Sequence, residues 1–483
     1  MSVSTMLRWS SAGILAIPCW AASLGGYVRE EIPLPPGEVM EISSIALMPE
    51  DQVAVTTRRG DLWICDGAYG EDLSQVRWHR FARDLHEPLG MFWKEGSLWL
   101  TQRPELTRIT DTDGDGEADR FETICADWGL TGNYHEYAFG SPPDREGNVW
   151  IALCLTGSFT SDAPWRGWCV RVTPEGEMIP TCSGLRSPGG IGFNREGDAF
   201  YTDNQGTWNG SSSLKWLRPG SFQGNPVGNS WHRLAGWPAP PEPKDPSRMV
   251  VERARFPDLV PPAVILPHGK VGQSPTAVVL DDTEGRFGPF AGQMLIGEQT
   301  HSQVQRVCLE KVGEWYQGAV FHFLEGFEAG IVPMRLAGDG SLFVGGTNRG
   351  WGSRGSKPFT FERVRWGGEV PFEMHHLSAI PEGFELTFTE PVDATSAGDP
   401  ASYAMDAWTY VYQSEYGSPE VDAVAPTVRS VQVMEDGRTV RMVIDGRVRG
   451  HVHHLRADGV RSVTGEALVH PEAWYTLNEI PEG

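Results

Sequence analysis

The sequence predicts an all-β protein, a six-bladed β-propeller followed by a C-terminal β-sandwich module. Three observations lead to this fold class. The 483 residues include 57 glycines, 36 prolines and 19 tryptophans, a composition typical of many turns and half-buried aromatic side chains. No long stripe of apolar residues recurs at helical spacing. A strand–turn–strand unit recurs six times along the chain.

Each repeat unit is an apolar strand, a glycine-containing turn and a second apolar strand, as in LGMFWKEGSLWL. The units begin at Ile45, Leu89, Tyr137, Gly189, Thr276 and Val332. Their spacing of about 40 to 55 residues, lengthened in the fourth unit by a Pro- and Gly-rich insertion at 221–272, is that of propeller blades. Six copies therefore predict six blades. Unrelated hairpins in an ordinary sandwich are the alternative, and the regular spacing disfavours them.

The pattern changes near Trp366. From about Pro371 onward, short alternating strands such as FELTFTEPV and TVRMVIDG predict a sandwich of the fibronectin or immunoglobulin type. We therefore expect the propeller at 23–368 and the sandwich at 369–483. The module contains an unusually aromatic stretch, YAMDAWTYVYQSEYGSPEV, which could pack the module onto the propeller or bind sugar.

Residues 1–22 form a predicted signal peptide. Arg8 precedes a short apolar run from Ala12 to Ala22, and small residues follow it. A run of this length fits export and is too short to span a membrane. No later stretch of the sequence predicts a transmembrane segment. The chain is therefore expected to be periplasmic or secreted.

The charge of the chain limits its partners. A net charge of −23 makes the protein a poor binder of phosphate backbones, so nucleic acid is not an expected partner. The sequence contains no CxxCH motif and hence carries no c-type haem of its own. Motifs of serine hydrolases, zinc proteases, dinucleotide-binding folds and P-loop proteins are missing from the sequence as well.

The segment DTDGDGEADRFE, Asp111 to Glu122, matches the twelve-residue calcium loop. Gly116 stands at its sixth position, where the loop turns sharply. The predicted metal ligands are Asp111, Asp113, Asp115, Glu117, Asp119 and Glu122. Because strands rather than helices flank the loop, we expect a structural Ca²⁺ in the outer part of the second blade and no EF-hand fold.

The register of the repeats predicts a polar mouth. The start of each first strand and the end of each second strand lie on the same face, so their side chains converge there. His135 is the predicted proton acceptor, because an imidazole titrates near neutrality. Four arginines would make the mouth cationic and suited to a ligand that carries carboxylates, namely Arg103, Arg186, Arg349 and Arg354.

These motifs resemble the glucose/sorbosone dehydrogenase family, which are soluble six-bladed propellers that use pyrroloquinoline quinone (PQQ) and Ca²⁺. HEYAFGSPPDREGNVWIAL resembles the family segment that carries the catalytic histidine, and RSPGGIGFNREGDAFYTDNQG resembles the following blade. The resemblance implies that His135 is the general base and that Arg186 contacts the cofactor. It also implies that Gln205, Gly206 and Thr207 hold Ca²⁺ and PQQ.

At other positions the sequence differs from the pattern of this family. In the fifth blade the family places a lysine against the quinone, where this sequence has Thr300 and His301. The paired arginines of the sixth blade are not reproduced in register, although Arg335 and Arg349 lie nearby. The strings GNYHEYAFG and GGTNRGWGSRG resemble more closely a group of exported planctomycete and verrucomicrobial propellers named as membrane-bound dehydrogenases.

Three functions are consistent with this sequence. The first is a PQQ- and Ca²⁺-dependent dehydrogenase that oxidises a hydroxyl of a carbohydrate or sugar-derived small molecule and passes electrons to a separate cytochrome. The second is a metal-assisted lyase or lactonase that acts on sugar acids at the same mouth. The third is a propeller without enzymatic activity that binds glycan or protein.

Overall fold

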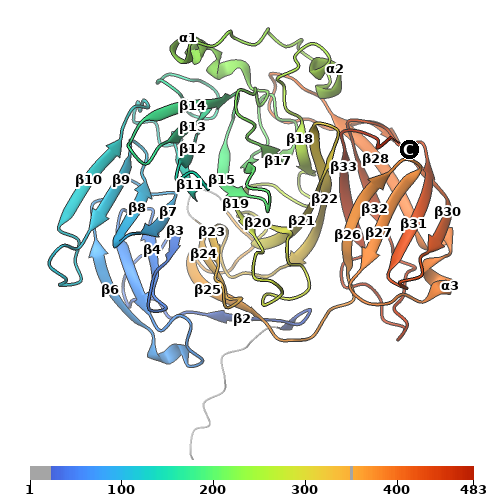
Figure 1. The fold of residues 1–483 in the computed structure, drawn as a ribbon, viewed down its shortest axis with the longest axis horizontal. Helices are drawn as coiled ribbons and strands as arrows, with labels where there is room; N and C mark the ends of the chain where they lie inside the picture. The colour runs from blue at the N-terminus through green and yellow to red at the C-terminus, as the bar shows by residue number, and fades with distance from the viewer. Residues whose placement is uncertain (1–22, 349–351, 483) are drawn as a thin grey trace, which may run out of the picture.

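The structure is a computed structural model that describes residues 23–348 and 352–482. The predicted signal peptide and Arg349 lie outside the described residues. Six blades of four strands each surround a common axis, and the inner strand of each blade contacts the inner strands of its two neighbours (Figure 1). The predicted fold class, a six-bladed propeller with a C-terminal sandwich, is confirmed.

The strands of each blade follow one another from the axis outward. The first three blades are β3 (Ile42–Leu47), β4 (Val53–Thr57), β5 (Leu62–Asp66) and β6 (Arg77–Ala82); β7 (Met91–Lys94), β8 (Ser97–Thr101), β9 (Leu106–Thr110) and β10 (Arg120–Cys125); and β11 (Ala138–Pro143), β12 (Val149–Leu153), β13 (Trp168–Val172) and β14 (Met178–Ser183). The fourth and fifth are β15 (Pro188–Phe193), β16 (Ala199–Asp203), β17 (Ser212–Trp216) and β18 (Pro262–Leu266); and β19 (Pro275–Leu280), β20 (Met294–Glu298), β21 (Gln303–Val312) and β22 (Trp315–Leu324). The repeat units of the sequence are the two inner strands of each blade.

The N-terminal segment closes the ring. The sixth blade consists of β23 (Ile331–Leu336), β24 (Leu342–Thr347), β25 (Phe359–Trp366) and, as its outer strand, β2 (Tyr27–Glu31), which β1 (Ser23–Leu24) extends. β2 pairs with β25 along five residues, from Tyr27↔Trp366 to Glu31↔Glu362. Tyr27 is buried and its hydroxyl donates to the Phe287 carbonyl oxygen of the fifth blade. The two ends of the propeller sequence are therefore joined through one sheet.

The inner hairpins form because apolar strand residues alternate around turns of fixed chemistry. In the second blade, Lys94 pairs directly with Ser97, and the two residues between them, Glu95 and Gly96, both have positive φ. That backbone is the two-residue turn whose twist matches the twist of a hairpin, and glycine adopts it without steric cost. Leu98 and Leu100 then face a core that the neighbouring blades complete.

The C-terminal module is a sandwich that shares a sheet with the propeller. One of its sheets contains β26 (Met374–Ile380), β27 (Gly383–Phe388), β31 (Thr439–Asp445) and β30 (Thr427–Val433), and the other contains β33 (Glu472–Leu477), β32 (His451–Arg456), β28 (Ala404–Tyr410) and β29 (Glu420–Val424). β33 pairs with β22, the outer strand of the fifth blade, so that the two sheets form one continuous eight-stranded sheet (Figure 1). Phe321 of the blade lies in the core of the module.

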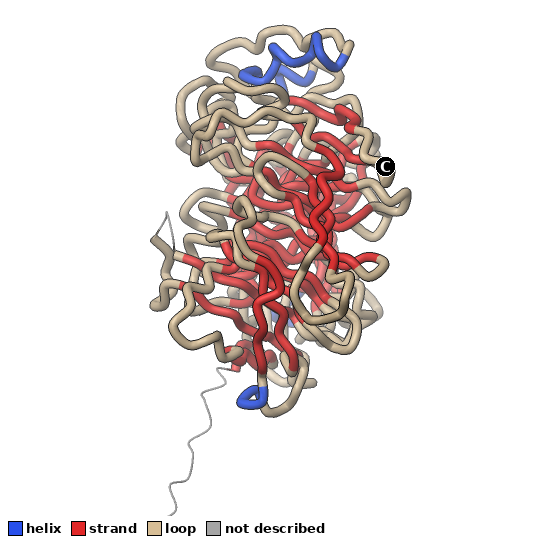
Figure 2. The backbone as a smooth tube through the Cα atoms, turned by 90° about the vertical axis from the view of Figure 1, so that its left-hand side faces the viewer, coloured by secondary structure: helices blue, strands red, loops and turns tan. Residues whose placement is uncertain are grey.

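Helices are short and lie at the periphery (Figure 2). α1 (His232–Ala235) and α2 (Met249–Arg253) belong to the insertion at 221–272, whose last part supplies β18, and α3 (Ala394–Ala397) belongs to the module. In the part of the chain that the structure describes, no helix combines the length and the hydropathy that a membrane crossing needs.

Candidate functional site at the propeller mouth

A cavity of about 670 Å³ opens where the inner strands begin. Every blade and the C-terminal module contribute to its wall. The lining includes Arg58, Leu89, His135, Arg186, Thr300 and Thr347 from the first to the sixth blade, and Tyr416 from the module. The predicted convergence of polar side chains at one face of the propeller is therefore present in the structure, and ligand sites of this size are common between structural units.

His135 precedes β11, in a loop that buried polar groups hold in place. The buried carboxylate of Glu136 accepts hydrogen bonds from Thr131 N and Thr156 Oγ1, at 2.7 and 2.6 Å. Arg166 is buried and donates through Nη1 to the carbonyl oxygens of Glu136 and Tyr137, both at 2.9 Å. Because buried polar groups that are fully paired resist displacement, the loop presents His135 in one position.

The imidazole of His135 is kept neutral. Burial lowers its pKa to about 4, and the positive charges of Arg186 and Arg103 act in the same direction. Ser158 Oγ lies 2.8 Å from both ring nitrogens. The Leu155 backbone also accepts a hydrogen bond from the ring, so the unprotonated nitrogen is the one that accepts from Ser158, and a ligand hydroxyl would replace Ser158 there. The side chain can therefore act as a base at neutral pH.

Arg186 precedes β15 and shares the cavity wall with His135. Its Nη1 donates to the Gln205 carbonyl oxygen at 2.6 Å, whereas its buried Nε has no hydrogen-bond partner among the described residues. Within the same part of the chain, no carboxylate lies within ion-pair distance of this guanidinium. A buried cation without a counter-charge is costly, and a carboxylate ligand would relieve that cost.

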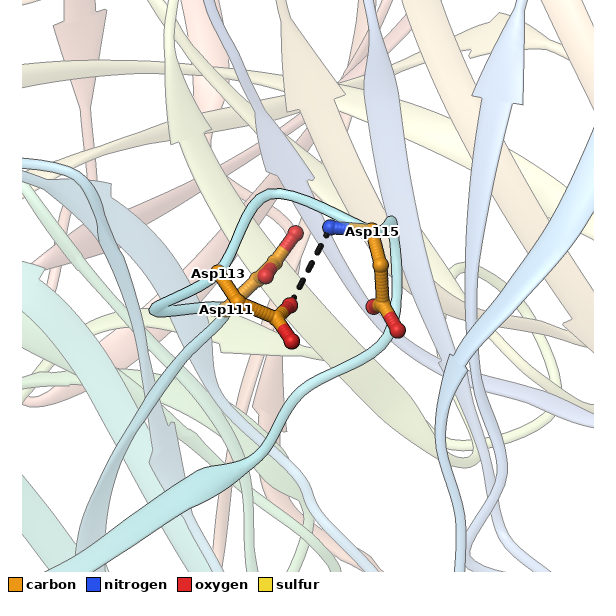
Figure 3. Close-up of side chains that lie close together, drawn as sticks. All are labelled: Asp111, Asp113 and Asp115. Carbon is orange, nitrogen blue, oxygen red and sulfur yellow. Dashed lines mark hydrogen bonds between the residues drawn. The ribbon is translucent and has the colours of Figure 1, made fainter.

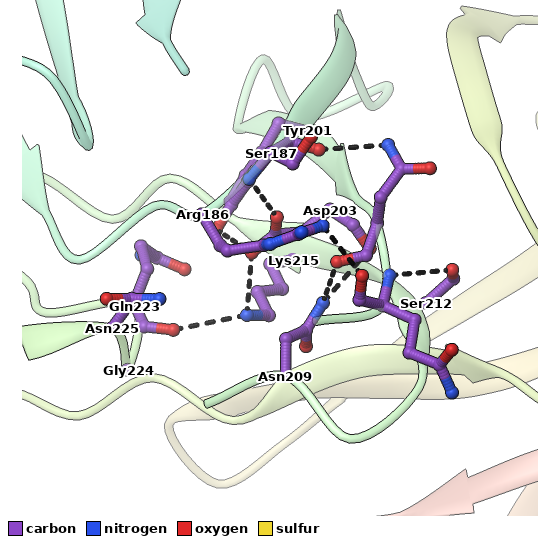
Figure 4. A network of polar contacts seen from close by, with 12 residues as sticks. Arg186, Ser187, Tyr201, Asp203, Asn209, Ser212, Lys215, Gln223, Gly224 and Asn225 are labelled. Carbon is purple, nitrogen blue, oxygen red and sulfur yellow. Dashed lines mark hydrogen bonds and ion pairs between the residues drawn. The ribbon is translucent and has the colours of Figure 1, made fainter. Parts of the chain in front are cut away.

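A buried ion pair supports the backbone beneath Arg186 (Figure 4). Asp203 and Lys215 are both buried, with 3.0 Å between Oδ2 and Nζ. The other oxygen of Asp203 accepts from Ser187 N, directly after Arg186, at 2.9 Å. Lys215 Nζ also donates to the Gln223 carbonyl oxygen at 3.2 Å. This network fixes the end of β16 against the start of β15, and no local sequence pattern predicts it.

The predicted cofactor ligands of the fourth blade divide into two groups. Gln205 lines the cavity. Gly206 and Thr207 contact the C-terminal module. Gly417 N donates to the Gly206 carbonyl oxygen, and Thr207 forms an isolated antiparallel β-bridge with Tyr416. Only Gln205 of the three therefore belongs to the wall, while the other two connect that wall to the module.

Three further predicted ligands do not line the cavity. Arg103 is buried behind the loop of His135 and donates to the carbonyl oxygens of Asn133 and Glu136, so its role is to position that loop. His301 is buried, and its backbone N–H donates to the Glu298 carboxylate. Arg335 lies further along β23 and reaches the Met91 carbonyl oxygen of the second blade at 3.3 Å, across the channel.

The acidic loop between β9 and β10 brings three carboxylates together (Figure 3). Oxygen atoms of Asp111, Asp113 and Asp115 all lie within 4.8 Å of one another. Asp111 accepts from Gly114 N and Gly116 N, and the bond from Gly116 contributes most to lowering the pKa of this carboxylate. Hard oxygen ligands so arranged suit Ca²⁺.

The remaining predicted ligands of the loop have other contacts. Asp119 accepts from Thr112 N at 2.9 Å, and Glu117 is exposed and donates its N–H to Asp115. Glu122 lies on β10 and forms ion pairs with Arg108 and Arg120, at 2.7 and 2.6 Å. The loop lies at the rim of the second blade and contributes no residue to the cavity wall. An ion there would act on stability rather than on chemistry.

The family to which the chain belongs follows from its match to one family model. Residues 71–344, more than half of the sequence, match the family described as Domain of unknown function (DUF7133). The chain belongs to the DUF7133 family. The match begins in the first blade and ends in β24 of the sixth, so the DUF7133 segment includes His135, Arg186 and the acidic loop. No protein of curated function matches the DUF7133 chain by sequence.

Solved structures share the fold of this DUF7133 protein. A Thermus thermophilus protein named as an oxidoreductase (glucose dehydrogenase) aligns with 16% identity and a TM-score of 0.51, covering 70% of this chain and 100% of its own. The PQQ domain of pyranose dehydrogenase from Coprinopsis cinerea aligns with 13% identity and a TM-score of 0.50, covering 71% of this chain and 96% of its own. At these identities the similarity establishes the propeller fold and nothing more.

Proposed function

We propose that the protein is an oxidoreductase of the sugar dehydrogenase type, which oxidises a carbohydrate hydroxyl at the propeller mouth with PQQ. The observation that carries this proposal is the presence, in the wall of one cavity, of a neutral imidazole, His135, and of a guanidinium without a carboxylate partner among the described residues, Arg186. The fold shared with proteins named as glucose and pyranose dehydrogenases supports it by analogy.

The cavity residues fit an anionic cofactor. PQQ carries carboxylates, and the guanidinium of Arg186, which has no carboxylate partner among the described residues, is a group that recognises carboxylates. Arg186 and Gln205 are the residues that would hold it. Bound PQQ would supply a two-electron oxidant, which the side chains of the wall do not provide.

His135 and Arg186 would have different roles in the reaction. A ring nitrogen of His135 would accept the proton of the substrate hydroxyl, which would take the place of Ser158 Oγ at that nitrogen. Arg186 would stabilise negative charge that develops on the substrate oxygen. A ligand carboxylate on Arg186 would offset the charge that helps to depress the pKa of His135, and so would make the imidazole a stronger base.

We propose further that Ca²⁺ binds the loop of Asp111, Asp113 and Asp115 as a structural ion, which the proximity of their carboxylates supports. We propose as well that the signal peptide at 1–22 directs export of the protein to the periplasm or out of the cell. Electrons would then leave to a separate cytochrome, since the sequence has no haem-attachment motif.

The direct test is reconstitution of the purified protein with PQQ and Ca²⁺, followed by a screen of aldoses and sugar alcohols with an artificial electron acceptor. We expect PQQ-dependent reduction of the acceptor, abolished in His135→Gln and strongly reduced in Arg186→Gln. The exposed Arg429→Gln variant, changed on the surface of the module, should behave as wild type. No PQQ-dependent reduction with any sugar would contradict the proposal.

The same preparations decide between the alternatives. Turnover of uronides or sugar lactones in the absence of PQQ, lost in His135→Gln, would identify a lyase or lactonase. Sugar binding without any turnover, unchanged in His135→Gln, would identify a binding protein.

A further inference from the structure

We infer that Tyr416 of the C-terminal module is a sugar-stacking residue, which with Phe159 and Tyr134 binds the apolar face of a pyranose ring at the propeller mouth. This inference rests on the proposed function for the class of ligand, a carbohydrate. It adds a specificity-determining residue from outside the propeller and gives the module a part in ligand recognition.

Exposed aromatic rings cluster at this cavity. Among the described residues, four phenylalanine or tyrosine side chains have more than a third of their surface exposed, and three of them, Tyr134, Phe159 and Tyr416, line the mouth. They are 65%, 54% and 57% exposed. Leaving large apolar rings in water is unfavourable, and a group of them around a concavity marks a ligand site.

The three rings come from different elements and meet around His135 and Arg186. The ring centroids of Tyr134 and His135 are 5.8 Å apart. Phe159, in the loop between β12 and β13, lies 6.2 Å from Tyr416 between ring centroids. The Cζ atom of Arg186 lies 5.1 Å from the Tyr416 ring centroid. The aromatic rings therefore lie next to His135 and Arg186, the two residues to which we assign catalytic roles.

The loop that carries Tyr416 is fixed to the propeller. It joins β28 to β29 and pairs with the fourth blade through its backbone, where Trp208 N donates to the Gln413 carbonyl oxygen at 2.7 Å and Ser418 N donates to the Gly210 carbonyl oxygen at 3.0 Å. These bonds add to the one between Gly417 and Gly206. A loop tied on both sides of Tyr416 holds its ring in place without the entropy cost of ordering it on binding.

A buried anchor fixes the same loop from below. Tyr412 is buried, packs on Trp208 with 4.9 Å between ring centroids, and donates its hydroxyl to the Gly224 carbonyl oxygen. Its backbone also exchanges two hydrogen bonds with Ser247 of the insertion at 221–272. The insertion thus supports the loop of the module. Since Tyr412 is buried and Tyr416 exposed, the two tyrosines of one loop have different roles, anchoring and ligand contact.

The chemistry of this wall matches a pyranose. A sugar ring presents axial C–H bonds on its faces, which pack on aromatic rings, and hydroxyl groups at its edge, which need hydrogen-bond partners. Asn204, Gln205 and Gln299 line the same cavity and supply amide groups. A flat aromatic cofactor is the competing occupant. One face of Tyr416 already meets the guanidinium that we assign to the cofactor, and the exposed remainder of the ring is left for a second ligand.

The test measures sugar and cofactor binding separately on the full-length protein. Binding of D-glucose, D-xylose and cellobiose would be followed by calorimetry with and without PQQ, and binding of PQQ by fluorescence quenching. We expect Tyr416→Ala to weaken sugar binding by about ten-fold, which corresponds to about 1.4 kcal/mol, and to leave PQQ binding within two-fold of wild type. Tyr416→Phe should bind sugar as wild type, because the ring is retained.

Phe121→Ala is the matched control, since Phe121 is 50% exposed on β10 and is not part of the cavity wall. It should change neither affinity, and all variants should melt within a few degrees of wild type. Unchanged sugar affinity in Tyr416→Ala, weakened PQQ affinity instead, or no sugar binding by wild type would each overturn the inference. Sugar binding that depends on Tyr416 without PQQ-dependent oxidation would uphold it while the dehydrogenase proposal fails.

Discussion

The side chain of Arg186 lies against the open face of Gly206. A Cβ atom built on Gly206 would stand 2.2 Å from Nε and 2.3 Å from Cζ of the guanidinium. The backbone of the same segment also holds the guanidinium through the hydrogen bond from Nη1 to the Gln205 carbonyl oxygen. A glycine is therefore required for the arginine to occupy its position in the wall of the cavity.

Gly206→Ala is predicted to displace the guanidinium and to weaken anion binding at the mouth. Because contacts below 3 Å are not tolerated, Arg186 must leave its present position, while the ion pair beneath it, Asp203 with Lys215, remains. We expect PQQ affinity to fall at least ten-fold, close to the loss in Arg186→Gln, with a small change in melting temperature. Fluorescence quenching and thermal melting measure the two effects.

The matched control is Gly338→Ala, because no atom lies within 4 Å of a Cβ built at Gly338. This variant should bind PQQ as wild type does. Equal PQQ affinity of Gly206→Ala and wild type would show that Arg186 does not hold the cofactor where its guanidinium now lies.

The pH dependence of stability is predicted to report on His135. Its pKa is about 4 in the folded protein and about 6.5 in an unfolded chain, where the imidazole is solvated. Between these values the unfolded chain binds more protons, so stability falls as pH decreases from 6.5 to 4, by as much as about 3 kcal/mol from this group. Above pH 6.5 the imidazole is neutral in both states and its contribution to stability is constant.

Denaturant titrations at several pH values test this prediction. His135→Gln should lose stability less steeply than wild type between pH 6.5 and 4. Phe121→Ala, an exposed change on β10 that removes no titratable group, should keep the slope of wild type. A slope unchanged in His135→Gln would mean that His135 is solvated and that burial does not keep its imidazole neutral.

The blades and the position of the mouth could be predicted from the sequence alone. The repeat units encode the two inner strands of each blade because alternating apolar residues and a fixed turn are local signals. His135 and Arg186 could be placed on one face for the same reason. Arg103 and Arg335 were predicted at the mouth as well, yet the first is buried behind a loop and the second reaches across the channel, because side-chain direction depends on packing that periodicity does not describe.

Contacts between distant segments could not be predicted from local patterns. Tyr416 was part of an aromatic stretch expected to pack on the propeller or to bind sugar, but its place beside Arg186 follows from a loop docked on the fourth blade. The outer strand β2 and the pairing of β33 with β22 likewise join segments far apart in sequence. Lys215, in the buried strand β17, gave no signal that it would pair with Asp203.

Removal of calcium is predicted to lower the melting temperature. If Asp111, Asp113 and Asp115 bind Ca²⁺, a free concentration a hundred-fold above Kd stabilises the folded state by about 2.7 kcal/mol. Wild type should therefore melt lower in chelator than in calcium, and Asp113→Asn should melt alike in both. Asp339→Asn, which alters a hairpin turn of the sixth blade, should keep the response of wild type to calcium. Identical melting of wild type in calcium and chelator would exclude a structural ion in this loop.

The C-terminal module is predicted to be required for the propeller to stay folded and soluble. A chain that ends at Gly368 would expose the edge of β22, which pairs with β33 from Gly318 to Phe321, and would uncover the apolar side chains of Ala319 and Phe321. An unpaired apolar edge strand promotes aggregation. We expect this truncation to aggregate or to melt well below wild type in gel filtration and thermal melting, whereas a chain lacking only residues 1–22 should behave as wild type. A monomeric truncated propeller with the melting temperature of wild type would show that the shared sheet contributes little to stability.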